Sequence, residues 1–302
     1  MNGRLWYAHR ARMSYRIEIG ESLAAAFGRI AAEEIDLAAA ELRRPDRGQA
    51  VHNARKALKR LRALLRSLRV TFPKKLFRAE NRRIAAAGRK ISPLRDVHVQ
   101  LRTLGKLPGG AGPAIRRIRR QLLRRQSAAA RGIPALRKTV RQMLDVSRQN
   151  LASWPLGKAT TANVAAGLKR VYKQGRAAFK IARHSPTPVH LHEWRKKVKS
   201  LVFGLDLIKG LGTGKLSRMA RSGDALGEAL GDDHDLFMVL GALRTEHRSH
   251  PAGDFPPLAK RINLRRAKLQ KRALKMGAKL YGEKPGAFEQ RLDRHLRRAV
   301  KI

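Results

Sequence analysis

Cysteine is absent from the 302-residue chain, and long apolar runs are missing as well. Without thiols the protein has no disulfides, no cysteine ligands for zinc and no thiol nucleophile. Without about 18 consecutive apolar residues we expect no transmembrane helix, and residues 1–20 lack the apolar centre of a signal peptide. The sequence therefore predicts a cytoplasmic protein with no membrane partner.

Acidic residues are scarce relative to basic ones. The chain has 22 Asp and Glu against 68 Lys and Arg, a formal net charge of +46 and a pI near 11.8. Self-repulsion on this scale destabilises a compact chain unless anions neutralise it, so we expect a polyanionic partner. Hydrophobic residues still make up 43% of the sequence, which is enough for a folded core.

Strand-like alternation is also absent, and apolar residues recur with helical spacing almost everywhere. Clusters of glycine and proline separate the periodic segments. These patterns predict an all-α protein of antiparallel bundles. The expected helices span residues 21–43, 48–70, 74–90, 94–104, 113–130, 134–152, 158–183, 189–209, 215–230, 233–247, 257–281 and 286–300.

The motif His-x-x-Arg-Lys-x-x-Lys occurs twice, beginning at His52 and at His192. Two further landmark pairs keep the same offset along the chain to within one position, namely Gly88 with Gly227 and Asp96 with Asp235. The shared offset predicts an internal duplication with repeats at 14–153 and 154–302. Residues 1–13 are then a basic N-terminal arm, or they precede a true start at Met13.

Each histidine lies on a basic helix face. In a helical projection the first segment has a leucine stripe on one side and a basic stripe on another. The basic stripe consists of Arg55, Lys59, Arg62, Arg66 and Arg69. His52 lies on the flank of the basic stripe that is farther from the leucines. The second segment turns Trp194, Val198, Leu201, Leu205 and Ile208 inward and His192, Arg195, Lys196 and Lys199 outward. A lone histidine usually caps or fills a core, but here the pattern favours an anion-binding face, because like charges on one stripe repel until an anion bridges them.

The paired motifs, each followed at nearly the same interval by an aspartate segment, resemble the CHAD domain, the conserved histidine α-helical domain. The resemblance implies two four-helix-type bundles related by a pseudo-twofold, with a basic central channel that binds inorganic polyphosphate. It places the polyphosphate contacts on His52, Arg55, Lys56, Lys59, Arg60 and Arg62, with Arg66 on the same stripe, and on His192, Arg195, Lys196 and Lys199.

The second repeat departs from the first. Ser200, Val202 and Asp206 stand where the first repeat has arginines at positions 60, 62 and 66. We therefore expect the second histidine helix to bind anion only along its first two turns, and the first helix to carry more of the binding.

Asp96 and Asp235 are repeat-equivalent carboxylates, for which we expect a structural role in orienting an arginine, a lysine or a backbone amide. The segment Asp232-Asp233-His234-Asp235 superficially offers metal ligands, but consecutive helical residues point in different directions. No P-loop and no Gly-x-Ser-x-Gly motif occurs. The sequence predicts no catalytic residues, no metal and no cofactor.

Further basic runs occupy residues 74–90, 116–125, 169–180 and 260–275, and they are either solvated faces or auxiliary polyanion contacts. The leading functional prediction is non-enzymatic binding of inorganic polyphosphate, with localisation to polyphosphate granules. One alternative is a sequence-non-specific nucleic-acid-binding protein, although aromatic residues at 5% of the chain offer few stacking platforms. A metal-dependent phosphohydrolase is the weakest alternative, because it needs a carboxylate cluster.

Overall fold

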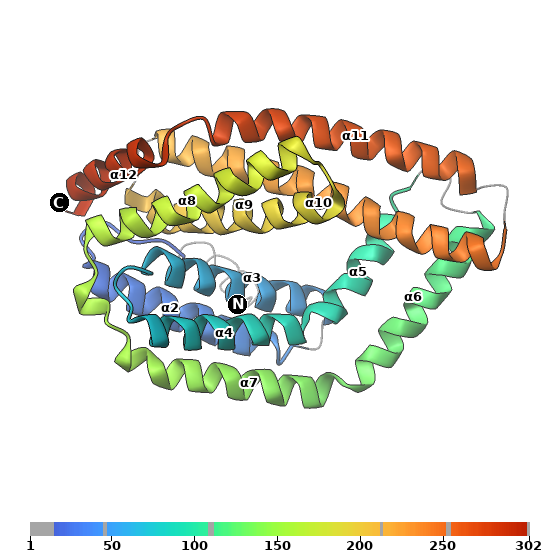
Figure 1. The fold of residues 1–302 in the computed structure, drawn as a ribbon. Coiled ribbons are helices and arrows are strands. Elements are labelled where there is room, and N and C mark those ends of the chain that lie inside the picture. The colour runs from blue at the N-terminus through green and yellow to red at the C-terminus, as the bar shows by residue number, and fades with distance from the viewer. Residues whose placement is uncertain (1–14, 45–46, 108–111, 212–213, 252–254, 301–302) are drawn as a thin grey trace, which may run out of the picture.

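The computed structural model describes residues 15–44, 47–107, 112–211, 214–251 and 255–300 (Figure 1). The regular structure in these ranges is entirely helical, which confirms the all-α prediction. The α-helices are α2 (Leu23–Glu41), α3 (Arg47–Ser67), α4 (Lys74–Lys90), α5 (Ser92–Leu104), α6 (Pro113–Arg131), α7 (Ile133–Gln149), α8 (Thr161–His184), α9 (Pro188–Ile208), α10 (Gly214–Ser249), α11 (Phe255–Leu280) and α12 (Pro285–Val300). None of these helices is long and apolar enough to cross a lipid bilayer.

One predicted helix boundary is wrong. Residues 215–230 and 233–247 belong to a single 36-residue helix, α10, with Gly231 inside it. The glycine marks close packing rather than a helix end, because a Cβ added there would lie 2.9 Å from Nη2 of Arg195 on α9. By contrast Pro93 does accompany a real break, since α4 ends at Lys90 and α5 restarts with the proline in its first turn.

The helices form two adjoining layers. The first contains α2, α3 and α4, with α7 packed on α2 and α4, and the second contains α8, α9 and α10, with α11 packed on α10 and α12 on α8 (Figure 1). The layers meet where α3 packs against both α8 and α9. The two histidine-bearing helices, α3 and α9, are therefore direct neighbours.

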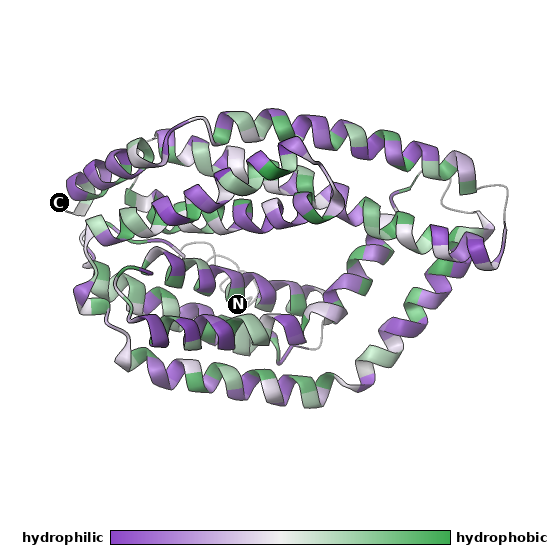
Figure 2. Cartoon of the chain, in the orientation of Figure 1, coloured by the Kyte–Doolittle hydropathy of each residue, from purple (hydrophilic) through white to green (hydrophobic). Residues whose placement is uncertain are grey.

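The main core runs through both layers. The predicted leucine stripe of α3 is buried, and so are the inward residues of α9, with Trp194 fully enclosed. Figure 2 shows hydrophobic and hydrophilic residues interspersed along the helices. Burial of these apolar faces is the main favourable term that offsets the charge repulsion at the surface.

A separate, smaller core lies at the far end of the molecule. It joins the C-terminal half of α10 to α5, α6 and α11 through side chains such as Ile118, Leu240 and Ile262. Both α10 and α11 contribute buried residues to the two cores, so these helices connect the small core to the main one.

The contact between the layers depends on small residues. A Cβ added at Gly167 of α8 would overlap the backbone carbonyl of Ser67 at the end of α3. The substitution Gly167→Ala should therefore lower the free energy of unfolding by about 1–3 kcal/mol, because backbone atoms cannot move aside cheaply. Urea denaturation measures this change.

Gly241→Ala is the matched control, since Gly241 lies in α10 with no atom within 4 Å of an added Cβ. This control should gain up to about 1 kcal/mol from helix propensity. A Gly167→Ala protein as stable as the Gly241→Ala protein would contradict the close approach of α3 and α8.

Candidate polyanion-binding site

Cations from three helices converge on Lys59. Although the lysine reaches solvent, the surrounding protein and then the positive charges of Arg55, Arg195 and Lys199 lower its pKa to about 7. Arg55 shares α3 with Lys59, whereas the other two residues belong to α9, and Arg95 of α5 adds a further charge. The motifs predicted separately from the two halves of the chain therefore line a single cationic cluster.

The arginines of this cluster are held by the helices behind them. Arg55 donates through Nη1 to the carbonyl of Gly88 at 3.2 Å and to the hydroxyl of Ser92, at the junction of α4 and α5. Arg195 lies against Gly231 of α10, and its Nε is buried without a hydrogen-bond partner in the described part of the chain. Both guanidinium groups are thus positioned by packing while retaining donors for a ligand.

Both motif histidines are neutral at physiological pH. Burial, and then the charges of Arg95 and Lys56, lower the pKa of His52 to about 4. Burial, and then the neighbouring His234, lower the pKa of His192 to about 4 as well. The ring centroids of the two histidines lie 4.3 Å apart. A neutral imidazole can donate one hydrogen bond to a phosphate oxygen, and a bound anion would favour its protonation.

The basic stripe of α3 continues beyond Lys59 and is joined by α9. Arg66 donates to Ser200 Oγ at 2.8 Å, and Arg62 donates to Asn81 Oδ1 at 3.1 Å. Burial, and then the charge of Arg62, lower the pKa of Arg66 to about 10. Burial also lowers the pKa of Lys197 on α9, and the charges of both arginines act in the same direction. Ser200, which stands where the first repeat has an arginine, thus receives an arginine from the other helix.

Arg60 occupies a different environment. Its guanidinium donates to the buried carboxylate of Glu34 at 3.1 Å and lies 4.7 Å from the centre of the Tyr15 ring. Burial, the leading effect, raises the pKa of Glu34 to about 7 despite the arginine. Arg60 therefore already has a carboxylate partner within the α2–α3 contact, unlike Lys59.

Three of the remaining motif cations lie near carboxylates. Lys196 pairs with Glu193, and Lys199 pairs with Asp224, each at 2.6 Å. Lys56 has its pKa lowered by burial and then by Arg60, while Glu34 acts in the opposite direction. Exposed pairs of this kind contribute little to stability, so they can exchange for a polyanion at small cost.

The two repeat-equivalent carboxylates lie at the edge of the cluster. The charge of Asp96 favours the protonated form of Arg55, and the charge of Asp235 favours the protonated form of Arg195, which works against the lowering of both pKa values by burial. Neither carboxylate forms a direct ion pair with its arginine in the described structure. Burial raises the pKa of Asp235, opposed first by Arg195. Within the described ranges no group of three or more His, Asp or Glu side chains could hold a metal ion.

The motif search missed Arg95, Arg102, Lys197 and His234. Arg95 and Arg102 of α5 face His52, and one Arg95 nitrogen is buried without a partner among the described residues. Arg95 immediately precedes Asp96, and His234 immediately precedes Asp235. Because the two aspartates are equivalent in the repeats, the sequence already indicates that Arg95 and His234 occupy equivalent positions.

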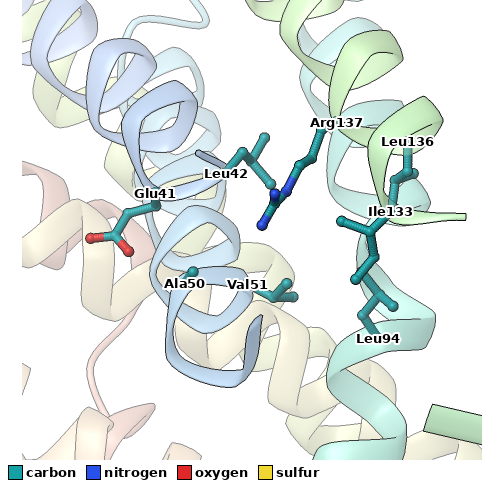
Figure 3. A pocket seen from close by; sticks show the side chains of 8 residues that line it. All are labelled: Glu41, Leu42, Ala50, Val51, Leu94, Ile133, Leu136 and Arg137. Atoms are coloured by element: carbon teal, nitrogen blue, oxygen red, sulfur yellow. The ribbon is translucent and has the colours of Figure 1, made fainter. Parts of the chain in front are cut away.

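A small pocket lies outside this cluster. It lies between the ends of α2, α3, α5 and α7, and its lining is largely apolar, with Val51, Leu94 and Ile133 among the side chains in Figure 3. It has room for about one water molecule. This pocket is therefore too small to hold an extended anion.

Comparison with known proteins agrees with this architecture. The crystal structure of the CHAD domain from the plant Ricinus communis superposes with a TM-score of 0.58 at 19% identity, covering 92% of this chain and 93% of that one. Among curated proteins no sequence matches. The family model of the CHAD domain matches residues 22–244, which is most of the sequence. The chain therefore belongs to the CHAD domain family.

Proposed function

We propose that the protein binds inorganic polyphosphate, without catalysing a reaction on it, at the cluster formed by α3, α5 and α9. The observation that carries the proposal is the convergence of Arg55, Arg195 and Lys199 on Lys59. Four neighbouring cations repel one another in the free protein, where Lys199 also pairs with Asp224, and successive phosphates would neutralise them. Affinity would arise from charge-assisted hydrogen bonds and from the release of counterions by the polymer.

The surface favours a phosphate polymer over a single-stranded nucleic acid. None of the described aromatic side chains falls in the exposed class, and Trp194 of α9 is fully buried. Bases would therefore find no stacking platform beside the cations. A chain of phosphates needs only cations and hydrogen-bond donors, which this surface supplies.

Binding without catalysis fits the surroundings of the histidines. His52 and His192 are surrounded mainly by cations, and Nδ1 of His192 has no hydrogen-bond partner within the described ranges. A histidine that acts as base or nucleophile is normally oriented by a further group, commonly a carboxylate. Binding of this type would localise the protein to polyphosphate granules in the cytoplasm.

We further propose that the site is built from two repeats, 14–153 and 154–302, related by a pseudo-twofold around a basic channel. Helix order supports this division, because the offset between the two histidine motifs also carries α2 onto α8, α3 onto α9, and α4 with α5 onto α10. The contacts repeat as well. His52 faces Arg95 as His192 faces His234, and the pair Arg55–Ser92 corresponds to the pair Arg195–Gly231.

Removing one cation from each histidine helix tests the shared site. The double variant Lys59→Gln, Lys199→Gln should weaken polyphosphate binding by about tenfold or more, equivalent to ~1.4 kcal/mol. The slope of log affinity against log salt should also fall, by about one for each lost phosphate contact. Fluorescence anisotropy with end-labelled polymer at several salt concentrations measures both quantities.

Lys74→Gln, Lys75→Gln is the matched control, since both lysines are exposed on α4 and the charge loss is the same. It should bind nearly as well as the unmodified protein. Equal losses in the two double variants would mean that net charge, rather than the cluster at Lys59, carries the affinity.

Competition distinguishes polyphosphate from nucleic acid as the ligand. Labelled long-chain polyphosphate is challenged with DNA at equal phosphate concentration in about 150 mM salt, where non-specific contacts are weak. Unlabelled polyphosphate should displace the label at much lower concentration than DNA does. Equal displacement by DNA would contradict the proposal and favour a nucleic-acid-binding protein.

Binding should be coupled to proton uptake through Lys59. A bound phosphate raises the lysine pKa above its free value of about 7, so the complex carries more protons than the free protein at pH 8. Affinity should therefore fall as the pH rises above 7. Calorimetry at pH 8 in buffers of different ionisation enthalpy reports the protons taken up.

Lys59→Arg should keep the charge and lose this uptake, because arginine stays protonated throughout the range. Lys74→Arg is the control and should leave the uptake unchanged. Uptake that persists in Lys59→Arg would show that another group is responsible.

A further inference from the structure

Helix α11 carries an unusual charge distribution. Its 26 residues include no acidic residue and nine basic ones. Only Arg266 has an ion-pair partner, Asp233 of α10 at 3.0 Å, within the described structure. The other eight are all exposed: Lys260, Arg261, Arg265, Lys268, Lys271, Arg272, Lys275 and Lys279.

Six of these cations lie in a straight line, which we term the α11 stripe. At about 100° per residue they fall within an arc of roughly 80°, and at about 1.5 Å per residue they extend over about 27 Å. The apolar residues packed into the protein, including Leu258, Ile262 and Ala273, lie on an adjacent side of the helix, centred roughly 90° from the stripe. The α11 stripe consists of Arg261, Arg265, Lys268, Arg272, Lys275 and Lys279.

The α11 stripe faces away from the cluster at Lys59. On α10, Gly231 contacts Arg195 of α9, whereas Asp233 pairs with Arg266 of α11. These two positions differ by about 200° around α10. Nearer its C-terminal end α11 also reaches α9, since a Cβ added at Gly277 would lie 2.5 Å from the ring of Trp194. Figure 1 shows α11 along the outer edge of the molecule, beyond α9 and α10 as seen from α3.

The arrangement is unfavourable for the free protein. Like charges three and four residues apart, such as Lys268 with Arg272 and Lys275 with Lys279, each cost a few tenths of a kcal/mol. No carboxylate in the described ranges pairs with the stripe to offset this repulsion. A linear anion lying along the helix would convert every one of these contacts into an attraction.

We propose that the α11 stripe is a second binding surface for an extended phosphate polymer, separate from the cluster at Lys59. This inference rests on the proposed function. The single row of cations matches one extended chain of phosphates rather than the two strands of a duplex. With two separate surfaces, one protein molecule joins two polymer segments, and many molecules condense long chains.

A charge-neutral variant of the α11 stripe tests this. Arg265→Gln, Lys268→Gln, Arg272→Gln and Lys275→Gln are combined, and long-chain polyphosphate is titrated with protein while light scattering is recorded. The unmodified protein should condense the polymer. The variant should bind short polyphosphate within about twofold of normal, because distant sites act independently, but should lose the condensation.

The matched control combines Lys74→Gln, Lys75→Gln, Arg78→Gln and Arg82→Gln, which removes the same charge from exposed positions on α4. It should condense the polymer normally. Condensation that survives in the stripe variant, or that is lost equally in the control, would overturn the second surface while leaving the first site intact. Failure of the unmodified protein to bind short polyphosphate would instead overturn the proposed function itself.

DNA supplies the remaining comparison. At equal phosphate concentration the stripe variant and the unmodified protein should scatter similarly with DNA. A stripe-dependent condensation of DNA without condensation of polyphosphate would reassign the α11 stripe to nucleic acid.

Discussion

The packing of α3 against α9 is the contact on which the rest of the structure depends. Each helix buries its apolar stripe in the common core, and the remaining sides bring like charges together around Lys59. Repulsion at this point is tolerated because the core beneath it is extensive. The free protein therefore holds an electrostatic strain, which the proposed binding of a polyanion would relieve.

Small residues make the arrangement possible. Gly223, Gly227 and Gly231 follow one another at four-residue intervals on α10, and each is approached by a side chain of α9. Two of those side chains, Lys199 and Arg195, belong to the cationic cluster. The glycines therefore make room for these long side chains between the two helices. Fold and proposed site are linked through these contacts, since a larger residue would displace the side chains of Lys199 and Arg195.

The helical class, the buried stripes and the outward position of His52 could be predicted from periodicity alone, because each depends on local spacing. His192 is only partly exposed, because its ring lies against His234 of α10. The continuity of α10 could not, since Gly231 breaks the local pattern for a reason that lies on another helix. The pairing of Arg60 with Glu34 was hidden for the same reason, because the carboxylate belongs to the preceding helix. Whether the two motifs face one site or two depends on how α3 and α9 pack, and no single-helix projection contains that information.

The central claim is that one phosphate polymer contacts both histidine helices at once. The most direct test is a crystal structure of the protein with a polyphosphate chain of defined length. We predict continuous density across the junction of α3 and α9, with phosphate oxygens in contact with Lys59, Arg55 and Arg195. Density confined to one of the two helices, or absent from the surface around Lys59, would contradict it.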